Sequence, residues 1–298
     1  IPMATEEDLP DRTAPPVELA PDFLGKGNLP DGITLPTGAV WNPAFWVYGS
    51  YRTAINYFDN GGRSPEVLEW ANRLDLFGNL RLSGTERLLI GFSPLRDNDE
   101  YSGYTFEPDS RDGWDDELNP DLTRLFFEGE FAEIFPNLDP DDRGIFDVGF
   151  SVGRQPLFFQ EGIMINDSTV DGVGITRDTI IIPGLTVDTR VTAFFGWNDV
   201  NRDNNREDRE AELYGLFTEG DWGWSTVQID AAFVNSDNDS LHVGVGATQR
   251  LHLFGRTVNS SIRINRSDAL ERETPRARDG TLVFGEFSIT PHGSNDLV

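Results

Sequence analysis

The feature of this sequence that most constrains its fold is a two-residue alternation of apolar and polar side chains. In residues 185–197 the odd positions carry Leu, Val, Thr, Ala, Phe and Trp, whereas the even positions are mainly polar or small. This period places the two sets on opposite faces of a β-strand. The pattern predicts about twelve strands, near residues 45–58, 70–82, 87–95, 123–133, 145–155, 173–182, 185–198, 210–219, 222–234, 241–253, 257–266 and 281–290.

The lengths of these segments and of their links indicate the architecture. Many segments exceed the about 5–6 residues of an ordinary globular strand and suit a tilted membrane-spanning strand of about 9–11 residues. Short links at residues 83–86, 183–184 and 220–221 largely alternate with long ones at 96–122, 199–209 and 267–280. A transmembrane barrel has short turns on one rim and long loops on the other. We therefore predict an all-β fold, a transmembrane antiparallel up-and-down β-barrel. A soluble acidic β-sandwich or jelly roll is the alternative, and it explains only the alternation.

Composition excludes several classes of function. The 298 residues carry 24 Lys and Arg against 51 Asp and Glu, a formal charge of −27. This balance argues against a nucleic-acid partner, which needs a basic surface. The chain has no cysteine and three histidines, so no disulfide, thiolate site or histidine cage is expected. We expect no enzymatic activity, because no nucleophile and base are arranged together in the sequence.

Residues 1–40 differ from the rest of the chain because they contain seven prolines. Proline at that density disfavours helices and central strands, so we predict an N-terminal periplasmic arm over 1–40 and a barrel over 41–298. No run of 18 apolar residues is present, and residues 1–10 lack the basic and apolar regions of a signal peptide. These features fit either a cytoplasmic protein or a mature exported one, and with the predicted barrel we expect a mature chain in a bacterial outer membrane, after removal of its signal peptide.

Charged residues of the polar sets are predicted to line the lumen, while the apolar sets face lipid. Trp197, Trp222 and Trp224 fall where interfacial aromatic girdles are expected. Mixed charge predicts passive diffusion of small hydrophilic solutes, with selectivity set by pore width and lining charge. A loop at 156–172 or 96–122 is expected to fold inward and narrow the pore. The predicted lining residues are Arg52, Arg73, Asp75, Arg81, Arg124, Glu128, Glu130, Asp147, Asp188, Arg190, Glu212, Asp230 and Arg263.

One acidic loop has the ligand spacing of a calcium site. The oxygen-bearing residues Asp199, Asn201, Asp203, Glu207 and Glu210 fall at positions 1, 3, 5, 9 and 12 of a calcium-binding loop. The flanking segments are predicted strands, so this is not an EF-hand, and a solvated acidic loop is the alternative. No other cofactor is expected.

Three short segments carry a family resemblance. Val152–Pro156, Glu161–Ile163 and Val170–Val173 resemble outer-membrane porins of the alginate-export-like type. The resemblance implies a barrel of 16–18 strands in all, so we expect the chain to continue past Val298. Export of a charged polymer would need an arginine-lined lumen, whereas the predicted lumen mixes both signs of charge.

A second function remains open from sequence. The barrel could be a scaffold or conduit that holds a periplasmic or cell-surface protein partner, or secreted cargo, with residues 1–40 as the docking arm. The other expected partners are outer-membrane lipid, lipopolysaccharide and small hydrophilic solutes.

Overall fold

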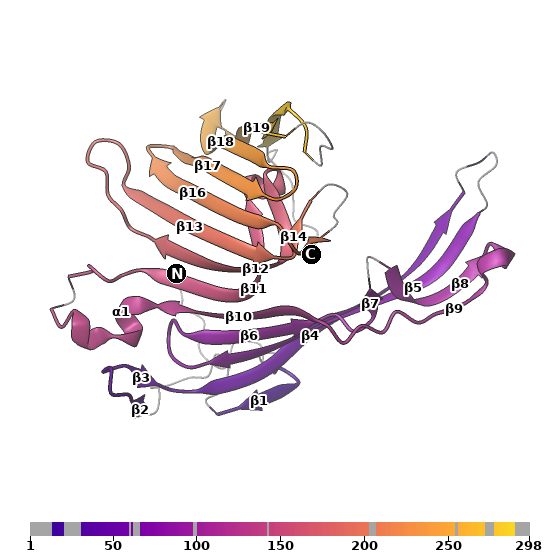
Figure 1. Ribbon diagram of the computed structural model, residues 1–298, viewed down its shortest axis with the longest axis horizontal. Coiled ribbons are helices and arrows are strands. Elements are labelled where there is room, and N and C mark those ends of the chain that lie inside the picture. The colour runs from indigo at the N-terminus through magenta and orange to yellow at the C-terminus, as the bar shows by residue number, and fades with distance from the viewer. Residues whose placement is uncertain are drawn as a thin grey trace. The chain divides into compact units, whose positions relative to one another are not determined.

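The computed structural model describes residues 14–20, 31–59, 61, 66–97, 100–141, 143–202, 207–253, 256–271 and 277–289. The chain forms two compact units, residues 1–36 with 40–123 and residues 37–39 with 124–298. Both consist mainly of antiparallel strands, most of which pair with their neighbours in the chain (Figure 1). The predicted all-β, up-and-down class is therefore confirmed. Much of the predicted arm, residues 1–13 and 21–30, lies outside the described residues.

The first unit is a sheet in which one long strand has two successive partners on one side. Strand β5 (Val67–Arg81) pairs along its length with β4 (Ala44–Phe58), and β4 pairs with β1 (Val17–Leu19). On its other edge, β5 pairs with β6 (Arg87–Phe92) and then with β8 (Glu100–Glu107). The smaller elements are β2 (Ile33–Thr34), β3 (Val40–Trp41), β7 (Arg96–Asp97), η2 (Asp109–Arg111) and β9 (Gly113–Asp115).

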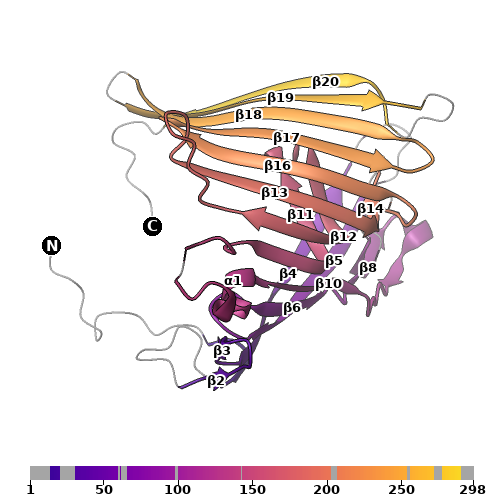
Figure 2. The same ribbon diagram turned by 60° about the vertical axis from the view of Figure 1, so that its left-hand side comes forward.

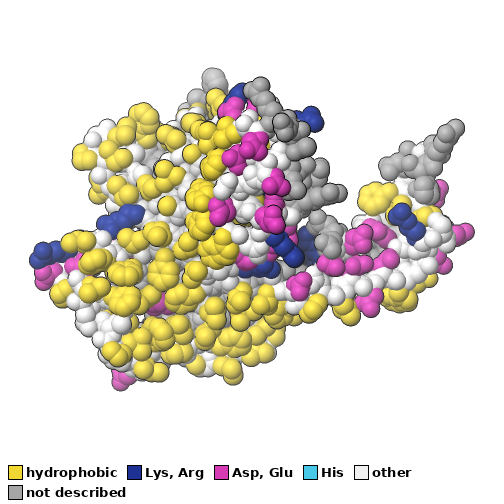
Figure 3. Space-filling view, viewed as in Figure 1, with side chains coloured by type: hydrophobic (Ala, Val, Ile, Leu, Met, Phe, Trp, Pro, Cys, Tyr) yellow, Lys and Arg dark blue, Asp and Glu magenta, His cyan; other side chains and the backbone are white. Residues whose placement is uncertain are grey.

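The prediction of one long loop over residues 96–122 is wrong, because β7, β8, η2 and β9 lie within it. β6 covers only part of the β5 edge, and β8 satisfies the backbone of the remainder. Trp114 packs edge-on against Trp70 and Tyr104, with ring centroids 6.0 and 5.3 Å apart. Acidic side chains gather over this region in Figure 3. Burial and the neighbouring carboxylates of Glu100 and Asp97 raise the pKa of Glu117.

The second unit is an antiparallel meander of nine strands in chain order, shown side by side in Figure 2. Among the described residues, β20 pairs only with β19 and no ladder joins it to β10, so this sheet is open. The strands are β10 (Leu122–Glu130), β11 (Gly149–Phe159), β12 (Ile165–Arg177), β13 (Asp188–Asn198), β16 (Glu212–Trp222), β17 (Ser225–Asn235), β18 (Ser240–Leu253), β19 (Arg256–Ala269) and β20 (Gly280–Ile289). The smaller elements are α1 (Phe131–Ile134), η3 (Pro136–Leu138), η4 (Gln160–Gly162), β14 (Val200–Asn201) and β15 (Glu207–Asp208).

All twelve predicted strands have a counterpart, but several boundaries differ. Strand β11 begins at Gly149 rather than near 145, and β12 begins at Ile165 rather than near 173. The link between β12 and β13 is longer than the predicted turn at 183–184, because β12 ends at Arg177. The turn expected at 220–221 lies at Gly223 and Trp224, where Gly223 adopts a φ of 62° that glycine allows without strain.

The strand register of the second unit sorts its side chains onto two faces. Paired residues across β10 to β20 form an outer face of exposed apolar side chains and an inner face that holds the buried charged ones. On β10, Leu125 is 40% exposed and points outward, whereas Phe126 is 7% exposed and points inward. The outer face includes Leu125, Ile175, Tyr214, Leu216, Ile229, Val245, Ile264 and Val283.

The alternation predicts a polar inner face, but the structure shows that this face is not uniformly polar. An apolar cluster lies on it, and the side chains of Phe159, Met164 and Ile165 pack against that cluster. The segment between β11 and β12 therefore covers the inner face with apolar contacts, which accounts for large apolar residues on both faces of β13 and β16. The buried members are Leu157, Val170, Phe194, Val200, Ala211, Leu213, Phe217, Ala232 and Val234.

Candidate functional site

A cavity of about 440 Å³ lies between the η4 turn and the inner face of the second unit. Three predicted lining residues meet there: Arg190 from β13, Asp230 from β17 and Arg263 from β19. Its other lining residues are Phe158, Phe159, Gln160, Glu161, Thr192, Phe217, Thr218, Glu219, Thr226, Gln228 and Thr248. The volume lies within the range of about 300–1,000 Å³ of ordinary ligand sites.

Arg263 is the centre of the hydrogen bonds that hold the η4 turn. Its side chain is only 2% exposed. Nη2 donates to Glu161 Oε1 at 2.6 Å, and Nη1 donates to Gln160 Oε1 at 3.0 Å and to Gln228 Oε1. Gln160 and Arg263 are 103 positions apart in the chain. These contacts fix the segment between β11 and β12 to a distant strand.

Two glutamines each bridge this arginine to a carboxylate. Gln160 accepts from Arg263 and donates through Nε2 to Asp230 Oδ2 at 2.6 Å. Gln228 accepts from Arg263 and donates through Nε2 to Glu219 Oε2 at 2.6 Å. The orientation of each amide follows from its partners, because an arginine only donates and a carboxylate only accepts.

The η4 turn has an unusual backbone conformation, and a glycine on β18 leaves space for it. Gln160 and Glu161 have φ angles of 54° and 55°, in the left-handed region that side chains disfavour. Such residues cost about 1–3 kcal/mol each and persist where the surroundings hold them. On β18, a Cβ at Gly246 would lie 2.5 Å from Arg263 Nη1 and 2.7 Å from Gln160 Oε1. The glycine therefore provides the space in which the turn and the arginine meet.

The remaining predicted lining residues are spread over both units. In the first unit, Arg73 Nε donates to Asp75 Oδ2 at 2.7 Å, and Arg52 of β4 lies opposite Arg73 of β5 in the strand register. The guanidinium carbon of Arg81 lies 5.7 Å from the centroid of the Trp46 ring. In the second unit, Arg124, Glu128 and Glu130 share the inner face of β10 with Phe126, and Asp188 shares the inner face of β13 with Arg190.

Two predicted residues lie elsewhere. Glu212 has the strand parity of Tyr214 and Leu216, so it belongs to the outer face, where it accepts from the Tyr214 hydroxyl at 2.9 Å. Asp147 precedes β11, because that strand begins at Gly149, and it lies in the preceding loop. Sequence reasoning missed Gln160, Glu161 and Glu219. Period-two alternation on β16 would have found Glu219, whereas the other two lie in a segment without periodicity.

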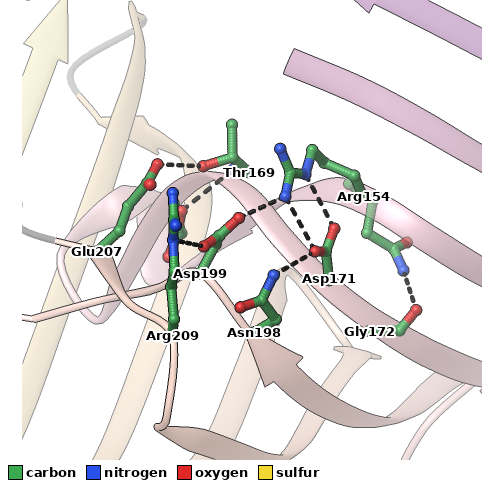
Figure 4. A network of polar contacts seen from close by, with 10 residues as sticks. Arg154, Thr169, Asp171, Gly172, Asn198, Asp199, Glu207 and Arg209 are labelled. Atoms are coloured by element: carbon green, nitrogen blue, oxygen red, sulfur yellow. Dashed lines mark hydrogen bonds and ion pairs between the residues drawn. The ribbon is translucent and has the colours of Figure 1, made fainter. Parts of the chain in front are cut away.

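A second polar network fixes the base of the predicted calcium loop (Figure 4). Arg154 lies between two carboxylates: Nε donates to Asp171 Oδ1 at 2.9 Å, and Nη2 donates to Asp199 Oδ2. Arg209 Nε lies 3.5 Å from Asp199 Oδ1. Asn198 donates to Asp171 at 2.7 Å. Asp199 is therefore engaged by two arginines.

Two other predicted calcium ligands, Asn201 and Glu207, also have protein partners. Asn201 donates to Asp167 from its backbone and from its side chain, both at 2.9 Å, and Glu207 accepts from Thr169 at 3.1 Å. Glu210 is in the loop after β15, and Asp203 lies outside the described residues. Within the part of the chain that the structure describes, no group of three His, Cys, Asp or Glu is placed to hold a metal ion.

Helices do not provide a membrane span in the described ranges, because none is both long and apolar enough. No protein-family model, curated protein or solved structure matches this chain.

Proposed function

We propose that this chain forms the wall of a bacterial outer-membrane porin, through which small hydrophilic solutes diffuse passively. The observation that carries the proposal is the outer face of the second unit, where exposed apolar side chains recur across neighbouring strands from β10 to β20. Water-soluble proteins rarely expose apolar patches larger than a few hundred Å². Lipid is the solvent that favours such a face on a sheet whose other face buries charges.

Strand dimensions support the proposal. Strands β13, β16 and β17 each contain 11 residues. At about 3.3 Å per residue and a tilt of about 40°, such a strand spans about 28 Å along the membrane normal. The apolar band of outer-membrane barrels is about 25 Å tall, so one strand is long enough to cross it.

Tryptophans lie at both ends of these strands. Trp197 is near the end of β13 and next to the start of β16, while Trp222 ends β16 and Trp224 lies in the turn that follows it. Trp224 is 84% exposed. An aromatic girdle at each interface is the expected arrangement in such barrels.

The inner face supports a solute path of mixed charge. Two arginines, Arg190 and Arg263, share one cavity with three acids, Glu161, Glu219 and Asp230, so the lining mixes both signs of charge with a small acidic excess. We expect weak cation selectivity that fades as salt screens the acidic loops. The η4 turn would narrow the path from inside.

Planar-bilayer recording tests the proposal. The purified full-length protein should produce steady conductance steps. Cysteine labelling in membranes is a second test: a water-soluble maleimide should label Ser151→Cys, on the inner face, faster than Val152→Cys on the outer face. In membranes the second cysteine would be covered by lipid. Equal labelling of the two sites would contradict the assignment of the faces, since Val152 is 42% exposed in the protein alone.

A second candidate is a scaffold barrel whose interior is filled. The apolar cluster on the inner face favours it, because a water-filled lumen is normally lined by polar groups. Correctly folded protein that gives no conductance would support this scaffold over the porin.

A further inference from the structure

One end of the first unit presents a row of apolar side chains that crosses four strands. Ile55 on β4 lies opposite Trp70 on β5, which in turn lies opposite Tyr104 on β8. Tyr104 lies opposite Trp114 on β9. Because directly paired residues project on the same side of a sheet, these four side chains form one row, which we call the aromatic row. Three strand spacings make it about 14 Å long.

Water reaches the aromatic row over much of its surface. Ile55 is 74% exposed at one end of the row and Trp114 is 73% exposed at the other. On the opposite face of β8 and β9 the side chains are polar and pair with each other, since Thr105 donates to Asp115 at 2.6 Å. Tryptophan and tyrosine are the residues that most often dominate the binding energy of protein interfaces. The aromatic row is therefore a sheet face suited to a partner.

Strand dimensions place this end of the sheet beyond the apolar part of a membrane. Strands β4 and β5 contain 15 residues each, which corresponds to about 38 Å along the membrane normal at a tilt of about 40°. The apolar band is about 25 Å tall. Strand β5 pairs with β6 over residues 76–81 and with β8 over residues 68–72, at its other end.

Carboxylates surround the aromatic row at the β8 end. Residues 100–117, which include β8 and β9, contain seven Asp and Glu and one Arg. A hydrogen bond to Asp112 raises the pKa of the Tyr104 hydroxyl, so one of these acids lies directly at the row. Charge of this density is unfavourable in lipid. We therefore place the β8 end in water, about 13 Å past the apolar band.

The rings of the row are inclined to one another. The plane of Trp114 makes an angle of 65° with that of Trp70 and of 82° with that of Tyr104. Rings at such angles offer no single flat platform on which a sugar ring could stack. A cation is attracted by any ring face within about 6 Å, and the surrounding carboxylates add to that attraction.

From these observations we propose that the aromatic row docks an extended, lysine- or arginine-bearing segment of another protein. The length of the row matches about four residues of an extended chain, at about 3.3 Å each, so two basic side chains on one side of the segment reach the rings. Charge complementarity selects this partner, because seven acids against one arginine repel an acidic one. The proposal goes beyond the porin and needs no conduction.

Three ligands test the chemistry of the partner. They are a peptide of alternating lysine and serine, the same peptide with glutamate in place of lysine, and maltohexaose as a neutral sugar chain. Calorimetric titration of the full-length protein in a non-ionic detergent should show saturable binding of the lysine peptide, at least tenfold tighter than binding of the other two. Equal or tighter binding of the glutamate peptide or of maltohexaose would overturn the proposal.

Variants separate docking at the row from attraction to the net charge of the chain. Trp114→Ala should weaken binding of the lysine peptide about fivefold or more, because it removes the most exposed ring of the row. Its matched control is Trp224→Ala, which removes an 84% exposed tryptophan from the second unit. Asp112→Asn should also weaken binding, about twofold or more, with Asp188→Asn as its control. Full affinity in either variant of the row, or an equal loss in its control, contradicts the assignment.

Cysteine labelling in lipid nanodiscs, which leave both sides of the membrane open to solution, tests whether lipid covers the row. A water-soluble maleimide should label Ile55→Cys, and the lysine peptide should slow this labelling at least threefold without slowing that of Ser151→Cys. No labelling of Ile55→Cys, or no protection by the peptide, would overturn the proposal.

Conductance separates the docking row from the porin. If the lysine peptide binds as expected but bilayers show no current, the docking row stands and the porin proposal fails. If bilayers conduct but the peptide does not bind, the porin stands and the docking row fails.

Discussion

Arginine at residue 229 distinguishes a lipid-facing strand from a water-facing one. Ile229 is 56% exposed on the outer face of β17, beside Val245 on β18. In water, a polar substitution at an exposed strand position changes stability by about 0.5 kcal/mol or less. In a bilayer, arginine on the lipid face of a barrel costs about 2–4 kcal/mol at the midplane and about 0–1 near the interface.

The position of Ile229 in its strand sets the expected size of the effect. It is the fifth residue of an 11-residue strand, so it lies about 13 Å along β17 and about 10 Å along the membrane normal at a tilt of about 40°. That depth is within about 4 Å of the middle of a span of about 28 Å. We therefore expect Ile229→Arg to cost about 2–3 kcal/mol.

Urea titration of the protein refolded into lipid vesicles measures this difference. Ile229→Ala is one control, because it removes the apolar side chain without adding charge. Thr226→Arg is the other: it places an arginine on the inner face of the same strand, near Asp221, which accepts from the Thr226 hydroxyl at 2.7 Å. A cost below about 0.5 kcal/mol for Ile229→Arg, or an equal cost for Thr226→Arg, would refute the lipid-facing assignment.

Three other changes have expected outcomes. Gly246→Val should cost about 1–3 kcal/mol and expose the η4 turn to proteases, because the new Cβ would meet Arg263 Nη1 at 2.5 Å; unchanged cleavage would show that the turn does not depend on this space. Asp199→Asn should cost about 1–3 kcal/mol in urea unfolding with or without calcium, because its 5% exposed carboxylate is engaged by Arg154 and Arg209; a loss that appears only with calcium would favour the metal loop instead. Arg190→Gln should raise cation preference in the reversal potential under a salt gradient, since Asp178 would lose its partner at 2.6 Å; an unchanged potential would remove Arg190 from the path.

Alternation predicted the strands and their faces because it records a local property. A side chain on a strand points to one face or the other whatever the strand pairs with, so Leu125 and Phe126 could be separated from sequence alone. The same rule failed at strand ends. Gln160 and Glu161 adopt positive φ angles at the end of β11, and nothing in their residue types favours that conformation.

The candidate cavity depended on contacts that no local pattern contains. Arg263 was predicted to line the lumen from its parity on β19, and it does lie on the inner face. Its partners Gln160 and Glu161 are 103 and 102 positions away, in a segment that the sequence predicted as a link folding inward, without indicating which strand it would contact. Which loop reaches which strand is decided by packing across the sheet, since loop closure costs little more for a long segment than for a short one.

The apolar cluster on the inner face stabilises the η4 turn against the sheet. A chain segment that packs on a purely polar surface replaces its hydrogen bonds to water with hydrogen bonds to protein. Each such replacement stabilises the folded state by only about 0.5–1.5 kcal/mol. Here Phe159 stacks on Phe217, and Met164 and Ile165 pack against buried side chains. Detachment of this segment from the inner face would expose apolar area, at a cost of about 25 cal/mol per Å². The polar contacts of Arg263 then select the position of the turn, while the aromatic contacts hold it against the sheet. Loss of Phe159 should therefore free the turn more than loss of any single hydrogen bond at Gln160.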